Sequence, residues 1–141
     1  MAHLDFLTVA TEYMQIWNAG NDGLLDKFAT PGIVVEYTHF EKVYRGIEEY
    51  KAMLKMTHQF FPDLKIAIKE ILLSEDKSKG TVLWEYSGTH KTGNLFGIDA
   101  SGKKVNVNGI TILETEGGLV RKEKGIVDNL TLIMQLGALK N

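Results

Sequence analysis

The sequence predicts an α+β domain in which helices cover one face of a strongly curved antiparallel sheet. Two observations support this fold class. Residues 4–61 contain three stretches with apolar side chains at helical spacing, whereas residues 64–127 show the two-residue alternation of strands. A short amphipathic stretch at residues 130–136 closes the chain as a fourth helix. A curved sheet closed by helices makes a cone with an open mouth, which is a natural small-molecule pocket.

The three N-terminal helices are expected at residues 4–19, 24–29 and 47–61. In the first, the side chains that recur at helical spacing are Phe6, Ala10, Tyr13 and Trp17. Pro62 ends the third, since proline disfavours a helical residue before it. Between the second and third helices, residues 33–37 are β-branched and predict a strand, with residues 43–44 pairing back as a brief hairpin.

The remaining strands predict a four-stranded antiparallel meander. They are expected at residues 64–69, 81–87, 105–115 and 119–127. Glycine-rich turn chemistry fills the loop at residues 91–103. Gly137 is expected to cap the closing helix.

Composition limits the functional classes. The 141 residues indicate a single domain spanning 1–141, with 44% hydrophobic and 24% charged residues. A formal net charge of -2 gives no electrostatic reason to expect nucleic acid as a partner. The absence of cysteine suits a cytoplasmic protein, and no apolar run is long enough to predict a membrane span. The four histidines lack metal-site spacing, so no metal is expected.

Five short segments have a familiar order and spacing. They are Phe61-Pro62-Asp63-Leu64, Gly88-Thr89-His90, Leu95-Phe96-Gly97-Ile98, Gly102-Lys103-Lys104-Val105 with Gly109-Ile110, and Val127-Asp128-Asn129-Leu130 with Gln135-Leu136-Gly137. In these segments the chain resembles the SnoaL-like polyketide cyclases, within the nuclear-transport-factor-2-like cone fold. The resemblance implies chemistry without a cofactor, namely intramolecular aldol ring closure on an aromatic polyketide ester. It also implies a homodimer, because a second copy commonly covers the wide sheet face.

The resemblance assigns the acid/base role to Asp128, at the end of the last strand. In an apolar pocket, burial would raise the pKa of this carboxyl and suit it to proton transfer near neutral pH. The alternative is that Asp128 caps the helix that begins near Asn129, because Asp is a favoured N-cap residue.

Two further residues follow from the resemblance. Relatives usually carry Trp four residues before the aspartate, where this chain has Lys124. Strand alternation places Lys124 on the same face as Asp128, where it could pair with Asp128, bind an anionic substrate group, or extend into solvent. His39 matches a histidine often present after the first strand, and it could bind a substrate carbonyl, relay a proton, or be a loop residue held by backbone. His90 is interpreted as structural.

Four more side chains are candidates for substrate contact. Tyr13, Trp17 and Trp84 could line the pocket, although aromatic side chains at such positions usually belong to the core. Asn108 shares a strand face with Asn106, and the sequence leaves open whether that face points into the pocket or into solvent.

The sequence therefore predicts a small enzyme without a cofactor that acts on a hydrophobic carbonyl compound, with Asp128 and His39 as catalytic residues. One alternative is a non-catalytic module that binds a small molecule. Another is an isomerase, or an epoxide hydrolase that would need a second carboxylate from Glu36, Glu85 or Glu114 facing the same cavity.

Overall fold

The computed structural model describes residues 5–138 and contains the predicted helices and strands in order, with an additional short hairpin at residues 94–99, where a loop was expected. The helices are α1 (Phe6–Tyr13), which continues into the 3-10 turn η1 (Met14–Trp17), then η2 (Asp22–Leu24), α2 (Leu25–Phe28), α3 (Ile47–Phe60) and α4 (Asn129–Leu136). The strands are β1 (Ala29–Tyr37), β2 (Tyr44–Arg45), β3 (Lys65–Leu73), β4 (Lys79–Thr89), β5 (Asn94–Leu95), β6 (Ile98–Asp99), β7 (Lys104–Glu116) and β8 (Leu119–Val127).

Local chemistry sets the helix ends. The Asp5 carboxylate accepts a hydrogen bond of 2.8 Å from the backbone N–H of Thr8 and so caps α1. Helix α3 ends at Phe60, two residues before Pro62, as the proline predicts. Gly137 adopts a left-handed conformation with φ of 94°, which confirms it as the cap that ends α4.

The main sheet has six strands in the order β2-β1-β8-β7-β4-β3. The predicted antiparallel meander β3-β4-β7-β8 is confirmed. Strand β1 adds to it by pairing with β8 in parallel, a contact the sequence did not predict. This pairing sets Val35 opposite Glu123 and Tyr37 opposite Gly125. Val35 and Tyr37, from the N-terminal part of the chain, are thereby placed beside the last strand.

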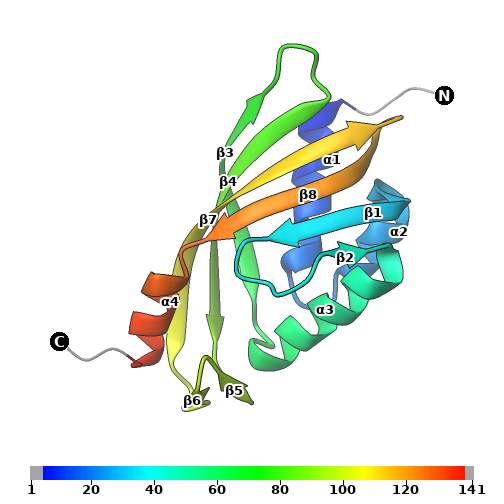
Figure 1. Cartoon of the computed structure of the whole chain (residues 1–141). Helices are drawn as coiled ribbons and strands as arrows, with labels where there is room; N and C mark the ends of the chain where they lie inside the picture. Colours follow the sequence, from blue (N-terminus) through cyan, green and yellow to red (C-terminus); the bar gives the residue numbers. More distant parts are fainter. Residues whose placement is uncertain (1–4, 139–141) are drawn as a thin grey trace.

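Helices α1, α2 and α3 lie together at one side of the sheet (Figure 1). Strand β7 shows how the two sheet faces differ. Its inward side chains are the buried Val105, Val107, Thr111 and Leu113. Its outward side chains are the exposed Asn106, Asn108, Ile110 and Ile112. The sequence left open which way Asn106 and Asn108 face, and the structure places both on the outer face of the sheet.

The segments that carry the family resemblance hold the lower end of the sheet together. The Asp63 carboxylate accepts hydrogen bonds of 2.7 Å from both the backbone N–H and the hydroxyl of Thr89. The Gln135 amide exchanges two hydrogen bonds with the backbone of Asn106, of 2.7 and 3.0 Å, and so fixes α4 against β7. The β5–β6 hairpin lies at this same end (Figure 1).

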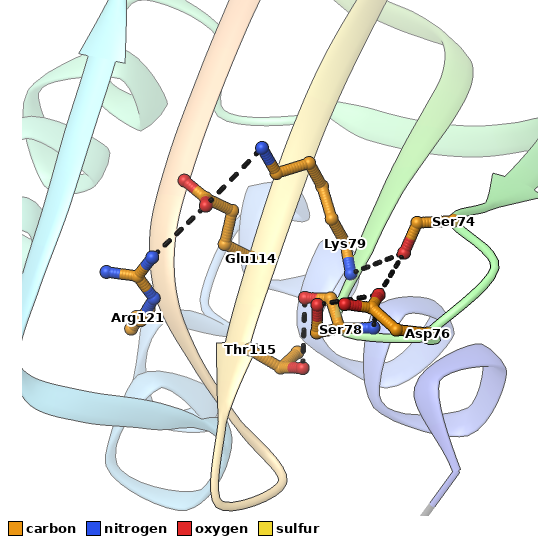
Figure 2. A network of polar contacts seen from close by, with 7 residues as sticks. All are labelled: Ser74, Asp76, Ser78, Lys79, Glu114, Thr115 and Arg121. Carbon is orange, nitrogen blue, oxygen red and sulfur yellow. Dashed lines mark hydrogen bonds and ion pairs between the residues drawn. The ribbon is translucent and has the colours of Figure 1, made fainter.

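A polar network holds the opposite end, at the β3–β4 turn (Figure 2). Asp76 accepts hydrogen bonds from the hydroxyls of Ser74 and Ser78, which lower its pKa to about 2. Beside it, Glu114 pairs with Lys79 at 3.6 Å and with Arg121 at 3.1 Å. Both ends of the sheet are thus fixed by polar contacts.

Candidate functional site

An apolar cavity of about 250 Å³ lies between the sheet, η1 and the end of α3. Its walls are mainly aromatic, with rings from Trp17, Tyr37, Phe60, Phe61, Trp84 and Tyr86. Trp17 belongs to η1 and Tyr37 to β1. Phe60 and Phe61 stand at the end of α3, and Trp84 and Tyr86 belong to β4. Such a wall selects flat, largely apolar molecules, because aromatic rings offer a large contact area at low entropic cost.

Few polar groups reach the cavity. His39 and Asn129 contribute to its lining, and no Asp or Glu of residues 5–138 does. The His39 side chain reaches the surface, and its ring centroid lies 4.3 Å from that of Phe40. Neighbouring groups shield the imidazole in part from solvent, and this desolvation lowers its pKa. The imidazole is therefore mostly neutral at pH 7 and can accept a proton. The Tyr86 hydroxyl makes no hydrogen bond within residues 5–138, and burial raises its pKa, so it keeps its proton.

The structure does not place Asp128 in this cavity. Its side chain is exposed and accepts hydrogen bonds from the backbone N–H of Thr131 at 3.1 Å and from the Thr131 hydroxyl at 2.6 Å. These bonds lower the pKa of Asp128. The prediction of a desolvated carboxyl with a raised pKa is wrong, and Asp128 caps α4 instead. The error arose because Asp128 follows the outward face of β8.

Lys124 and Asn108 also lie on the outer face of the sheet, away from the aromatic cavity. Lys124 is exposed, as the prediction of a solvated lysine described, and it forms no ion pair with Asp128 in the described part of the chain. Asn108 and Asp128 border an open depression of about 420 Å³ on that outer face, together with Ile126. The sequence-based expectation that Asn108 and Lys124 contact a substrate in the main pocket is therefore not met by their positions.

Tyr13 lies behind the cavity wall, not in it, so the expectation that it touches a ligand is also corrected. Its hydroxyl donates a 2.5 Å hydrogen bond to Oε1 of Glu123, a carboxyl with no exposed surface. The Tyr50 hydroxyl donates to the same oxygen at 2.5 Å, and the Tyr37 hydroxyl donates to Oε2. Three tyrosines from α1, β1 and α3 thus converge on one buried carboxyl of β8. We call Glu123, Tyr13, Tyr37 and Tyr50 the Glu123 cluster.

Hydrogen bonds extend the Glu123 cluster toward the other cavity wall. The indole N–H of Trp84 donates to Oγ1 of Thr111 at 2.8 Å. Thr111 in turn lies 2.9 Å from the Tyr37 hydroxyl, which donates to Glu123. An indole N–H can only donate, so Thr111 accepts from Trp84. The Thr111 hydroxyl can then donate to Tyr37, and Tyr37 donates to Glu123, so all three hydrogen bonds can run toward the carboxyl.

Two opposing effects act on the Glu123 carboxyl. Complete burial raises its pKa, and the hydroxyls of Tyr13, Tyr37 and Tyr50 partly offset that rise by stabilising the charged form. The net direction is upward. Burial and the nearby carboxyl raise the pKa of each tyrosine well above its usual range, so all three remain protonated donors.

Trp17 links the Glu123 cluster to the cavity. Its ring lines the cavity and packs edge-on against Tyr37 and Tyr50, at centroid distances of 5.7 and 6.0 Å. Its indole nitrogen is buried and has no hydrogen-bond partner within residues 5–138.

Of the seven residues singled out from the sequence, Trp17, Trp84 and His39 line the cavity. His90 is 1% exposed and its Nε2 lies 2.8 Å from the Gly93 carbonyl, consistent with the structural interpretation. Sequence reasoning missed Glu123, because Arg121-Lys122-Glu123-Lys124 resembles a solvated charged run. The available signal was alternation, since Glu123 shares a face with Gly125 and Val127.

Within residues 5–138 no three His, Asp or Glu side chains gather in a group able to hold a metal ion. Among the helices of that same range, none has the length and hydrophobicity that a membrane crossing requires.

Comparison with known proteins agrees with this architecture. The sequence model of the SnoaL-like polyketide cyclase family matches residues 7–136. Among solved structures, TsrD from Streptomyces laurentii is 27% identical, with a TM-score of 0.80 and coverage of 94% of this chain and 95% of that one. IdmH from Streptomyces antibioticus, provisionally described as a polyketide cyclase, is 19% identical, with a TM-score of 0.81 and coverage of 95% and 99%. No match was found among functionally curated proteins.

AclR from Streptomyces galilaeus, provisionally described as a hydroxylase, is 21% identical, with a TM-score of 0.78 and coverage of 96% and 97%. At under 25% identity, IdmH and AclR show the shared fold alone. The neighbours of this fold thus carry more than one described activity, so chemistry has to be argued from the residues of the cavity.

Proposed function

Because the chain belongs to the SnoaL-like polyketide cyclase family, we propose that it is a cyclase-like enzyme that transfers protons on a hydrophobic, aromatic carbonyl compound, with His39 as the base. The observation that carries this proposal is the lining of the cavity. It is aromatic, no carboxylate of the described residues contributes to it, and His39 is the one histidine among the described residues that line it.

The proposed step needs only groups on the cavity wall. A carbon between two carbonyls is already acidic, so the neutral imidazole of His39 can remove its proton. The Tyr86 hydroxyl, free of other hydrogen bonds within residues 5–138, is available to donate to the enolate oxygen that forms. The enolate carbon then attacks a second carbonyl of the same molecule, and the new alkoxide recovers the proton from His39.

Deuterium exchange tests this assignment without knowledge of the natural substrate. An aryl β-diketone such as benzoylacetone in D₂O would be followed by NMR for exchange at its acidic carbon. His39→Gln should slow the protein-catalysed rate by about 100-fold or more, the usual contribution of a positioned base. Asp128→Asn is the comparison variant, and its rate should stay close to that of the unmodified protein. The reverse pattern would return the proton-transfer role to Asp128.

A non-catalytic binding module is the second candidate, and one observation favours it. Asp128 is engaged as a helix cap with a lowered pKa, so the acid/base expected from the family resemblance is not available in the cavity. Tight binding of aromatic ketones without any protein-catalysed exchange would support this candidate. The hydrolase alternative has less support, because Glu85 pairs with Lys69 at 3.7 Å and no carboxylate pair of the described residues lines the cavity.

A homodimer is part of the proposal. The outer sheet face carries exposed Ile110, Ile112 and Ile126, and the last is 60% exposed. A cluster of large apolar side chains on one sheet face favours burial against a second copy. Light scattering after size exclusion should give twice the monomer mass, and Ile126→Lys should give the monomer. A monomeric unmodified protein would contradict this assignment.

A further inference from the structure

The aromatic walls of the cavity are held from behind by hydrogen bonds. Tyr37 and Trp84 present their rings to the cavity, while their polar atoms bond to Glu123 and Thr111 on the far side. Trp17 differs, because its indole nitrogen makes no hydrogen bond within residues 5–138 and its ring packs edge-on against Tyr37 and Tyr50. Two of the wall rings, Tyr37 and Trp84, are therefore held by the same buried hydrogen-bond network.

The Glu123 carboxyl is the end of that network. It accepts from three hydroxyls that come from three different elements, and it has no exposed surface. No cation of residues 5–138 pairs with it. A buried carboxyl without a cation is costly to keep in a fold, so its retention calls for a compensating role.

From this geometry we infer that Glu123 is a positioning residue. It holds the ring of Tyr37 directly, and that of Trp84 through Thr111, in the orientation that a flat aromatic ligand requires, without touching the ligand. The inference rests on the proposed function, since it takes the aromatic cavity as the ligand site. Orienting the walls in advance removes the entropic cost of ordering them when the ligand binds.

The cluster offers a matched pair of variants for testing this role. Tyr37→Phe removes a hydroxyl that donates to Glu123 from a ring that lines the cavity. Tyr50→Phe removes a hydroxyl that donates to the same carboxyl from a ring that does not line it. Both changes keep the ring and delete one buried hydroxyl, so a purely structural role predicts similar consequences. Glu123→Gln keeps the shape of the side chain but replaces one acceptor oxygen with a donor.

Binding would be measured with prodan, a fluorescent naphthyl ketone whose emission reports transfer into an apolar site. Tyr37→Phe and Glu123→Gln should each weaken prodan binding by about two- to tenfold, the effect of ordering a further side chain on binding. Tyr50→Phe should weaken prodan binding less than Tyr37→Phe does, because the Tyr50 ring does not line the cavity. Equal effects of Tyr37→Phe and Tyr50→Phe, or no effect of Glu123→Gln, would overturn the positioning role.

A second readout needs no ligand. The chain has two tryptophans, and both Trp17 and Trp84 line the cavity, so tryptophan fluorescence reports on the cavity wall. Acrylamide should quench this fluorescence more strongly in Tyr37→Phe and Glu123→Gln than in Tyr50→Phe. If prodan fails to bind the unmodified protein, the proposed ligand class is wrong, and quenching still decides the role of Glu123. Unchanged quenching in all three variants would overturn it.

Discussion

Replacing Gly125 with alanine should destabilise the protein, because the ring of Tyr37 lies directly over this glycine. A Cβ atom at Gly125 would stand 2.8 Å from both Cδ2 and Cζ of Tyr37, and closer still to Cε2. Ordinary carbon contacts are about 3.5–4.0 Å, so the ring has to move by about 1 Å. Such a shift also disturbs the hydrogen bonds of the Tyr37 hydroxyl to Glu123 and Thr111.

The size of the effect follows from three contributions. Overpacking a buried site costs about 1–3 kcal/mol. Each of the two disturbed hydrogen bonds of Tyr37 contributes about 0.5–1.5 kcal/mol when intact. Against these losses, an alanine restricts the unfolded chain and contributes about 0.4–1 kcal/mol of stability. The free energy of unfolding should therefore fall by roughly 1–5 kcal/mol.

Urea unfolding followed by circular dichroism measures this change, and Gly32→Ala is the control. A Cβ at Gly32 would meet no atom within 4 Å, so that variant should be unchanged or slightly stabilised. Gly125→Ala should also cost at least about 1 kcal/mol less in a Tyr37→Leu background, where the ring is absent. If Gly125→Ala proves as stable as Gly32→Ala, the packing of Tyr37 against β8 has been described wrongly.

Three further changes have defined outcomes. Thr111→Val leaves the buried indole N–H of Trp84 without an acceptor, so urea unfolding should show a loss of about 1–3 kcal/mol. The lowered pKa of Asp76, caused first by the Ser74 hydroxyl, stabilises the fold above the unfolded value of 3.8; this contribution should disappear in acid denaturation as pH falls through about 2, and Asp76→Asn should lack it. The raised pKa of Glu123 has the opposite sign: its contribution is present below the unfolded value of 4.5 and is lost as pH rises through the folded pKa, so the stability difference between the unmodified protein and Glu123→Gln should change across that window.

The helices and the four-strand meander could be predicted because their signals are local. Periodicity, Pro62 and Gly137 each act within a few residues of the structure they determine. The parallel pairing of β1 with β8 could not be predicted in this way, because residues 29–37 carry no local sign of their neighbour. Only the packed structure decides which strand such a segment joins in the sheet.

Predicting the site residues required knowing which face of each strand points inward, and the sequence did not settle this for β7 and β8. Lys124 and Asp128 were correctly placed on one face, but a one-residue shift decides which face is buried. Asp128 was assigned to the pocket from the family resemblance, whereas its face of β8 is the exposed one, with Ile126 60% exposed. Glu123 was hidden for the complementary reason, because a carboxyl between lysines seldom forms the centre of a core.

The two glycines beneath the aromatic rings have a consequence for how this cavity could be reshaped. A side chain at Gly109 would overlap the indole of Trp84, just as one at Gly125 would overlap Tyr37. Each aromatic ring occupies the space that a side chain at the glycine would need, so a larger residue at the glycine requires a smaller one in place of the ring. Exchanging them in pairs, such as Gly109→Ala with Trp84→Phe, would move empty space from the backbone to the cavity. The contour of the binding surface is therefore encoded partly on strands β7 and β8, at positions that contribute no side chain of their own.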